Sequence, residues 1–305
     1  MAAKNPFVRM RRGIMRFREI HGLLGLSGLF NVMMLEKARF APRSLVRLKL
    51  RPFHSMPVLL RAGTSDYSTL QTTFLQQYHL PHAALRAQAT ILDLGCNVGY
   101  TVMHFAHEYP DARIFGVEMD RDNYNLARIN TAGYRNISLL HRAVSTTNGT
   151  VSYGRTARED SYRISSERAE EAGAQIQVES MTIGFIIQEL GIEHIDYLKM
   201  DIEGEEVRVL SEGLSDLSWL NIVDMLNIEV HTDREDLTRI MALLRAHNFF
   251  AWKENLHWSC VRAVKAEGTN RRPSSWGALD QRPRPLEIHQ APGTLHEADS
   301  RSLAE

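Results

Sequence analysis

The fold of this chain is decided by one stretch of sequence, Ile91-Leu92-Asp93-Leu94-Gly95-Cys96-Asn97-Val98-Gly99-Tyr100-Thr101. Its first four residues predict a buried strand, and the residues from Gly99 onward predict a helix. Gly95 allows a sharp turn because it has no Cβ, and Gly99 would let a ligand approach the helix start closely. Free backbone N–H groups at a helix start attract carboxylate or phosphate groups. The stretch therefore predicts a ligand site where a strand meets a helix.

Strands and helices alternate along the chain after this stretch. We expect strands at 91–94, 113–118, 137–141, 195–201 and 225–230, helices at 99–108, 121–131, 205–211 and around 237–244, and a closing hairpin at 249–253 and 258–264. This alternation predicts an α/β fold with a mainly parallel, doubly wound sheet and helices on both faces. Ligands of such sheets bind beyond the carboxyl ends of the strands.

The composition is that of an ordinary globular protein, with 305 residues, 44% of them apolar and 24% charged. No run of 18 apolar residues occurs, so no conventional transmembrane helix is expected. The two cysteines, Cys96 and Cys260, cannot form a disulfide scaffold, which favours a reducing compartment. We therefore expect a cytoplasmic protein, with peripheral contact at the inner membrane as an open alternative.

The net charge of zero hides a division of the chain into regions. Residues 1–55 carry 12 Lys and Arg against 2 Asp and Glu, a net charge of +10 that the remaining chain balances. We expect 1–55 to be a basic, helical N-terminal arm with a first strand, 56–266 to be the alternating domain, and 267–305 to be a proline-rich, disordered tail. Within the domain, the polar segment 146–175 fits an insertion or a lid.

The basic arm has three interpretations. Its helix could pack on the domain with Arg9, Arg11, Arg12, Arg16 and Arg18 in solvent, it could lie on an anionic membrane, or it could be a targeting peptide. Nucleic-acid binding is not expected, because the arginines lack the interleaved aromatic residues that stack on bases. The sequence makes no prediction of the oligomeric state.

The glycine stretch favours one ligand class over another. A dinucleotide fold would show G-x-G-x-x-G, whereas here Asn97 stands in place of the second glycine. Asp93 before the turn suits an amine better than a pyrophosphate. The pattern D-x-G-x-x-x-G resembles the first motif of class I methyltransferases that use S-adenosylmethionine (SAM). Glu118, at the end of the next strand, could accept both ribose hydroxyls.

A second group of polar residues lies at the rim expected for catalysis. Lys199 and Asp201 share one face of the strand at 195–201, which runs into an acidic turn that contains Glu203. Glu229 and His231 share a face at the end of the next strand. His231 is the first candidate for a general base because of its ordinary pKa of about 6.5, with Asp201 as the alternative. Asp201, Glu203 and Glu229 could instead bind a divalent cation.

Taken together, these motifs resemble the FkbM family of SAM-dependent methyltransferases over about residues 56–264. The resemblance rests on D-L-G-x-N-x-G from Asp93, D-x-x-K-x-D-x-E-G-x-E from Asp196, the late I-E-V-H and the segment 60–66. It implies a Rossmann-like fold and methylation of a hydroxyl on a sugar, glycolipid or polyketide-like molecule. It also implies cofactor contacts from Asp66, Asp93, Gly95, Cys96, Asn97, Gly99, Tyr100, Thr101, Glu118, Met119, Arg142, Ala143 and Asp201.

Two other functions stay open at this point. The enzyme could methylate a nitrogen or a macromolecule, or the domain could be a SAM-binding partner module without catalysis. The non-catalytic alternative predicts that the rim carboxylates can be replaced without loss of function.

Overall fold

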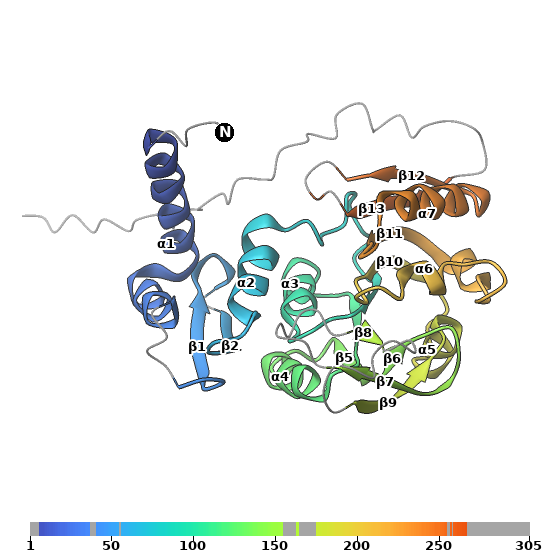
Figure 1. Cartoon of the computed structure of the whole chain (residues 1–305), viewed down its shortest axis with the longest axis horizontal. Helices are drawn as coiled ribbons and strands as arrows, with labels where there is room; N and C mark the ends of the chain where they lie inside the picture. Colours follow the sequence, from blue (N-terminus) through green and yellow to red (C-terminus); the bar gives the residue numbers. More distant parts are fainter. Residues whose placement is uncertain are drawn as a thin grey trace, which may run out of the picture.

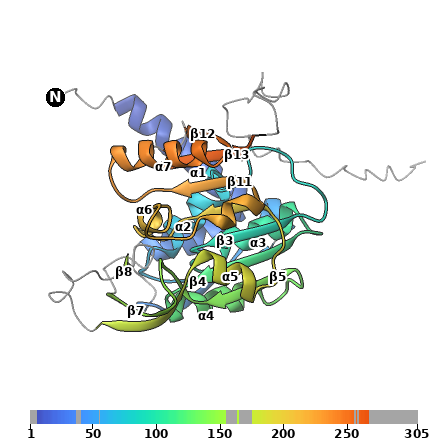
Figure 2. The same cartoon turned by 90° about the vertical axis from the view of Figure 1, so that its right-hand side faces the viewer.

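The computed structural model describes residues 6–36, 41–54, 56–154, 163–164, 175–254, 257 and 259–266, with the side chains of the arm described from Arg18 onward. The tail expected at 267–305 and most of the segment 146–175 lie outside these residues. A seven-stranded sheet forms the centre, in the order β12-β13-β11-β10-β3-β4-β5. In Figure 2 the labelled strands of this sheet follow one another from β12 and β13 near the top to β4 and β5 lower in the view.

The central sheet confirms the mainly parallel α/β fold. Parallel pairs join β3 (Thr90–Leu94) to β4 (Arg113–Glu118) and β10 (Ile195–Met200), β4 to β5 (Ile137–His141), and β10 to β11 (Val223–Glu229). The antiparallel hairpin of β12 (Phe249–Lys253) and β13 (Cys260–Lys265) closes the β11 edge. Because the chain leaves β3 toward β4 and returns at β10, the strand order reverses between β3 and β10. Ligands of doubly wound sheets bind at such a point.

Helices cover both faces because successive strand residues point to opposite sides. Leu92 and Leu94 belong to the main core, which includes apolar residues of α5 (Ile183–Glu189) and α7 (Arg234–Ala246). Ile91 belongs to a second cluster, with Phe105 of α3 (Tyr100–Glu108). α4 (Arg121–Thr131) follows β4, with Asp120 as its N-cap, and α6 (Glu206–Val209) is shorter than the helix expected at 205–211.

A smaller four-stranded sheet was not expected from the sequence. It has the order β6-β9-β7-β8, with β6 (Ala143–Val144), β7 (Gly149–Gly154), β8 (Arg163–Ile164) and β9 (Ile176–Met181). β7 and β8 lie inside the segment expected to be an insertion or lid. The sheet packs around Tyr153, which is fully buried and donates a hydrogen bond to Asp120. The sequence did not indicate these strands, because the apolar residues of this segment are isolated and a short strand with polar neighbours shows little alternation.

The N-terminal region packs on the domain as an additional layer at one edge of the molecule (Figure 1). It contains α1 (Pro6–Glu36), which is kinked at Gly25, and a two-stranded antiparallel sheet of β1 (Leu45–Leu50) and β2 (Met56–Arg61), followed by α2 (Asp66–Gln71). The boundary expected at 55–56 lies between the two strands of this hairpin. Leu23, Leu48 and Leu60 share a core cluster with Tyr100 of α3. Among the described residues, none of the helices has the length and apolarity to cross a bilayer.

Candidate active site

A cavity of about 430 Å³ opens at the carboxyl ends of the central strands. This volume lies in the range of small-molecule sites, roughly 300–1,000 Å³. The glycine loop after β3, the end of β4 and the ends of β10 and β11 all contribute to its wall. The predicted site residues in that wall are Gly95, Cys96, Asn97, Tyr100, Thr101, Glu118, Met119, Arg142, Lys199, Asp201, Glu203, Glu229 and His231. The fold therefore brings most of the predicted cofactor and catalytic residues to one cavity.

The two glycines of the loop allow close packing against neighbouring segments of the protein more than they allow the approach of a ligand. Gly95 has a φ of +85°, and a Cβ placed on it would lie 1.8 Å from the carbonyl oxygen of Asp201. Gly99 has a φ of +86°, and its Cβ would lie 3.1 Å from Cα and Cβ of Ala127 in α4. Gly99 is not among the residues that line the cavity, although Val98 and Tyr100 are, so its contact with a cofactor stays a prediction. The absence of a Cβ lets α3 pack closely against α4 at this point.

Glu118 is held in place at the end of β4, in the wall of the cavity. Its Oε2 accepts a hydrogen bond from the backbone N–H of Asn97 at 2.9 Å, and its Oε1 accepts one from that of Asp120 at 2.7 Å. Burial raises the pKa of Glu118 to about 7, against the opposing effect of these N–H groups. Each carboxylate oxygen has two acceptor sites, so Glu118 can still accept hydrogen bonds from a diol.

Asp93 forms a buried ion pair with Lys199. It is fully buried, and its Oδ1 accepts a hydrogen bond from Lys199 Nζ at 3.0 Å while its Oδ2 accepts one from the Thr101 hydroxyl. Asp93 is not among the residues that line the cavity, and its contact with a cofactor amine stays a prediction. The Asp93–Lys199 pair connects β3 to β10, where Lys199 also lies 3.5 Å from Asp201 Oδ2.

Lys199 is a positioning residue and not a proton acceptor. Burial lowers the pKa of Lys199, but the carboxylates of Asp93 and Asp201 raise it more, so its pKa lies above the ordinary value. A lysine that keeps its proton cannot accept one from a substrate. Lys199 pairs with Asp93 and Asp201, and its wider catalytic role stays a prediction.

His231 is surrounded by carboxylates. Its Nδ1 lies 3.0 Å from Glu206 Oε1, and its Nε2 lies 3.5 Å from Asp201 Oδ1, 3.6 Å from Glu203 Oε2 and 3.8 Å from Glu229 Oε1. Burial lowers the pKa of His231, but these carboxylates outweigh it and raise the pKa to about 9. The imidazole is therefore protonated at neutral pH, which argues against the prediction that His231 is the general base.

Glu206 stabilises the conformation of the acidic turn. It is fully buried, and it accepts hydrogen bonds from the backbone N–H groups of Ile202 and Gly204. It thereby holds the turn that presents Glu203, which has a left-handed φ of 56°. The sequence indicated an acid at a helix start, but not that this acid also orients His231.

The two remaining rim glutamates titrate near neutrality. Burial and the neighbouring charge of Asp201 raise the pKa of Glu203 to about 8 and that of Glu229 to about 7. Tyr78 donates a hydrogen bond to Glu229 Oε2 at 2.9 Å. Burial is the main cause of the raised pKa of both glutamates and the charge of Asp201 adds to it, whereas the neighbouring carboxylates alone raise the pKa of His231. The cluster therefore favours a cation or a proton.

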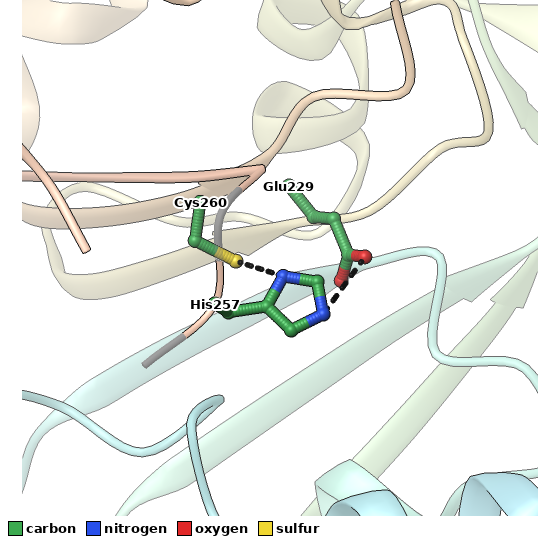
Figure 3. A group of neighbouring side chains, drawn as sticks. All are labelled: Glu229, His257 and Cys260. Atoms are coloured by element: carbon green, nitrogen blue, oxygen red, sulfur yellow. Dashed lines mark hydrogen bonds and ion pairs between the residues drawn. The ribbon is translucent and has the colours of Figure 1, made fainter. Parts of the chain in front are cut away.

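Tyr78, His257 and Cys260 were missed by the sequence analysis. The ring of His257 stacks on Tyr78 with centroids 4.5 Å apart. Figure 3 shows His257 between two partners, with Nδ1 3.4 Å from Cys260 Sγ and Nε2 3.7 Å from Glu229 Oε1. Burial lowers the pKa of His257, so this ring is neutral at neutral pH. No motif indicated these residues, because they come from segments about 180 positions apart.

Two groups of side chains in the described part of the chain could hold a metal ion at this end. Ligand atoms of Asp201, Glu203 and His231 lie within 4.8 Å of one another, as do those of Glu229, His257 and Cys260. In the second group His257 directs opposite ring nitrogens to its two neighbours (Figure 3), which does not suit one shared ion. The first group matches part of the predicted cation set, with His231 in place of Glu229.

The other predicted cofactor residues have mixed outcomes. Arg142 and Met119 are in the cavity wall, and Arg142 forms an ion pair with Glu179 of β9 at 2.9 Å. Ala143 is buried in the core of the smaller sheet and does not contact the cavity. Asp66 is not among the residues that line the cavity, and its carboxylate forms a buried ion pair with Arg61 at 2.7 Å. The cofactor contacts expected of Ala143 and Asp66 stay predictions.

The Arg61–Asp66 pair leads to a prediction about stability. Asp66→Asn is expected to destabilise the protein by about 3 kcal/mol, because it leaves the Arg61 charge buried without its counter-charge. Urea unfolding measures this loss. The double variant Arg61→Met with Asp66→Leu removes both charges and should be more stable than Asp66→Asn. The folded Asp66→Asn variant should retain its affinity for SAM. A large loss of this affinity would indicate that Asp66 contacts the cofactor.

The strand order and the cavity define the class of this protein as a class I, Rossmann-like methyltransferase. Residues 93–251, just over half of the chain, match the family model of the methyltransferase FkbM domain. The chain therefore belongs to the FkbM family of SAM-dependent methyltransferases, and the resemblance found in the sequence is confirmed.

Three curated relatives match parts of the chain. The 31-O-demethyl-FK506 methyltransferase FkbM of Streptomyces tacrolimicus is 37% identical over 79 residues, 26% of this chain and 30% of the relative. The 2-O-methyltransferase NoeI of Sinorhizobium fredii is 24% identical over 177 residues, 53% of this chain and 73% of the relative. The AMB antimetabolite synthetase AmbE of Pseudomonas aeruginosa is 28% identical over 231 residues, 62% of this chain. The chain spans only 11% of the length of AmbE and 30% of that of FkbM.

Solved structures show a distant likeness. A fibrillarin/Nop5p complex matches 74% of this chain and 98% of its own chain at 15% identity and a TM-score of 0.40. The fibrillarin of Aeropyrum pernix in complex with SAM matches 72% and 92% at 12% identity and a TM-score of 0.34. The assignment of the fold rests on the strand order and the family match instead.

Proposed function

We propose that this protein transfers the methyl group of SAM to a hydroxyl oxygen of a sugar, glycolipid or polyketide-like acceptor. The observation that carries the proposal is a single cavity with two different ends. The glycine loop and Glu118 form one end, and the carboxylates around His231 form the other. A cofactor bound at the first end can present its methyl group to an acceptor at the second.

The chemistry needs alignment and one proton acceptor. The acceptor oxygen attacks the methyl carbon, the carbon–sulfur bond breaks, S-adenosylhomocysteine leaves, and the hydroxyl proton passes to a base. We assign this base to Glu229, because its pKa of about 7 allows it to be ionised at neutral pH and then to hold a proton. Tyr78 orients Glu229 through its hydrogen bond, and the protonated His231 holds the neighbouring carboxylates.

The choice of oxygen as the acceptor atom is supported by the relatives. FkbM and NoeI are both named as O-methyltransferases. A hydroxyl must lose its proton during attack, which gives the titratable carboxylates at the rim a chemical purpose. Incubation with SAM carrying a ¹³C-labelled methyl group and a panel of sugar, glycolipid and polyketide acceptors tests the proposal. A labelled methoxy signal by NMR supports it, and a labelled N-methyl signal would replace it with nitrogen methylation.

SAM binding gives a direct prediction for Glu118. Glu118→Gln is expected to weaken SAM binding by roughly ten- to a hundredfold, because charge-assisted hydrogen bonds contribute about 1.5–3 kcal/mol. Isothermal titration calorimetry measures the Kd. The matched control is Glu235→Gln, since the Glu235 side chain is 82% exposed on α7 and lies outside the cavity. An unchanged Kd for Glu118→Gln would contradict the ribose role, and absence of SAM binding by the unmodified protein would contradict the whole proposal.

A divalent cation is the alternative way to activate the hydroxyl. It would be held by Asp201, Glu203 and His231 and would orient the acceptor oxygen. If Glu229 acts alone, removal of metal with a chelator leaves the rate of methyl transfer unchanged. If the chelator abolishes methyl transfer and added Mg²⁺ or Mn²⁺ restores it, the cation, and not Glu229 alone, activates the hydroxyl.

A further inference from the structure

The second half of α1 exposes an apolar stripe. Leu26 is 75% exposed, Phe30 is 61% exposed and Met33 is 46% exposed. Their spacing of four and then three residues places the three side chains on one helix face. Leu26 and Phe30 are the most exposed large apolar side chains among the described residues. Contiguous exposed apolar side chains mark sites of interaction, since a single exposed leucine needs no explanation but a stripe does.

The stripe is held rigidly on the domain. Leu24 and Val32 are buried in the N-terminal core together with Leu48 of β1, so the opposite face of this helix is already packed. Gly25 kinks α1 with a φ of 68°, and a Cβ there would lie 2.9 Å from Arg51 Cδ. The kink places the segment of the stripe across the edge of the molecule, far from α7 and the β12 edge of the sheet (Figure 1). The stripe is therefore presented outward and does not fill an internal gap.

The charge around the stripe indicates its partner. The half of α1 before Gly25 carries Arg9, Arg11, Arg12, Arg16 and Arg18 against one acid, Glu19. Residues 1–55 as a whole have a net charge of +10. Two copies of such an arm would repel each other, which disfavours a dimer through this face. Nucleic acid would match the charge but would leave the apolar stripe in water.

We propose that α1 docks this protein on an anionic membrane surface, with Leu26, Phe30 and Met33 inserted among the lipids and the arginines on the headgroups. The stripe supplies apolar area for burial among the lipids and the arginines supply attraction to anionic headgroups, and these two contributions set the strength of interfacial binding. Each basic residue near an anionic surface adds about fivefold to the binding constant. The docking depends on none of the cavity residues, so it is independent of the proposed function.

Vesicle co-sedimentation tests the docking. The full-length protein is expected to bind phosphatidylcholine vesicles that contain phosphatidylglycerol, and to bind pure phosphatidylcholine vesicles at least about tenfold more weakly. The double variant Leu26→Ser with Phe30→Ser should lose at least about tenfold in binding to the anionic vesicles. The matched control is Leu214→Ser, since Leu214 is 56% exposed and lies in the turn after α6. This control should bind as the unmodified protein does.

A second variant tests the charge separately. Arg11→Gln with Arg12→Gln should weaken binding to anionic vesicles by roughly 25-fold, and higher salt should weaken binding of the unmodified protein. SAM affinity of each variant, measured by calorimetry, shows that the domain is folded and separates this test from that of the methyl transfer. Equal binding to neutral and anionic vesicles, or full binding by the Leu26→Ser, Phe30→Ser variant, would overturn the docking. A dimer that this variant converts to a monomer, without vesicle binding, would assign the stripe to self-association.

Discussion

Gly95→Ala is expected to destabilise the protein by more than about 4 kcal/mol and to abolish SAM binding. The added Cβ would lie 1.8 Å from the carbonyl oxygen of Asp201, and the φ of +85° is itself unfavourable for alanine. Relief of this clash requires the glycine loop to move away from β10, which separates Asp93 from Lys199. Thermal unfolding and calorimetry with SAM measure the two losses.

Gly184→Ala provides the matched control for this substitution. Gly184 lies near the start of α5, and a Cβ there would meet no atom within 4 Å. Because alanine favours a helix more than glycine does, this change should stabilise the protein by about 0.5–1 kcal/mol. If Gly95→Ala unfolded at the same temperature as the unmodified protein and bound SAM normally, the close approach of the loop to β10 would be wrong.

The second large effect is expected for Glu229→Gln. This change keeps the shape of the side chain but removes its basicity, so kcat should fall by about 10²- to 10⁴-fold. SAM affinity should change by less than about twofold, because Glu229 lies at the opposite end of the cavity from Glu118. Steady-state kinetics with an identified acceptor and calorimetry with SAM measure the two quantities. A variant that retains more than about a tenth of the activity would exclude Glu229 as the proton acceptor.

The pH dependence gives an independent signature of this base. A base works in its deprotonated form, so kcat/KM of the unmodified enzyme should rise with pH and level off above about pH 7, the pKa of Glu229. The charged and titratable groups that face Glu229 are Tyr78, Asp201, His231, His257, Lys199, Glu203 and Cys260. Glu229→Gln should abolish the rise. If the pH profile of kcat/KM keeps its midpoint in the variant, that midpoint belongs to another of these groups.

Much of the fold follows from local patterns. The expected strands at 113–118 and 137–141 agree residue for residue with β4 and β5, and the expected helix at 121–131 agrees with α4. Periodicity and the positive φ of Gly95 are properties of neighbouring residues, so a single sequence can show them. The smaller sheet was missed because its strands are short and the pairing of β7 with β9 joins segments separated by about 25 residues.

Some features of the candidate site could likewise be predicted from the sequence, and others could not. The sequence by itself determined which rim residues share a strand end, and so it placed Asp201, Glu203, Glu229 and His231 in one cavity. It did not show that Asp93 pairs with Lys199, which is 106 positions away, or that Tyr78 contacts Glu229, which is 151 positions away. Those partners are set by packing of distant segments.

The protonation states at the rim were decided by the tertiary structure alone. The ordinary pKa of histidine made His231 the first choice for a base, yet the carboxylates of Glu206, Asp201 and Glu203 raise that pKa to about 9. Electrostatic energy depends on distance through space and on burial, and neither can be read from separation along the chain. The sequence therefore determined the fold, the family and the position of the cavity, whereas the three-dimensional arrangement of charges decided which of its side chains is able to accept a proton.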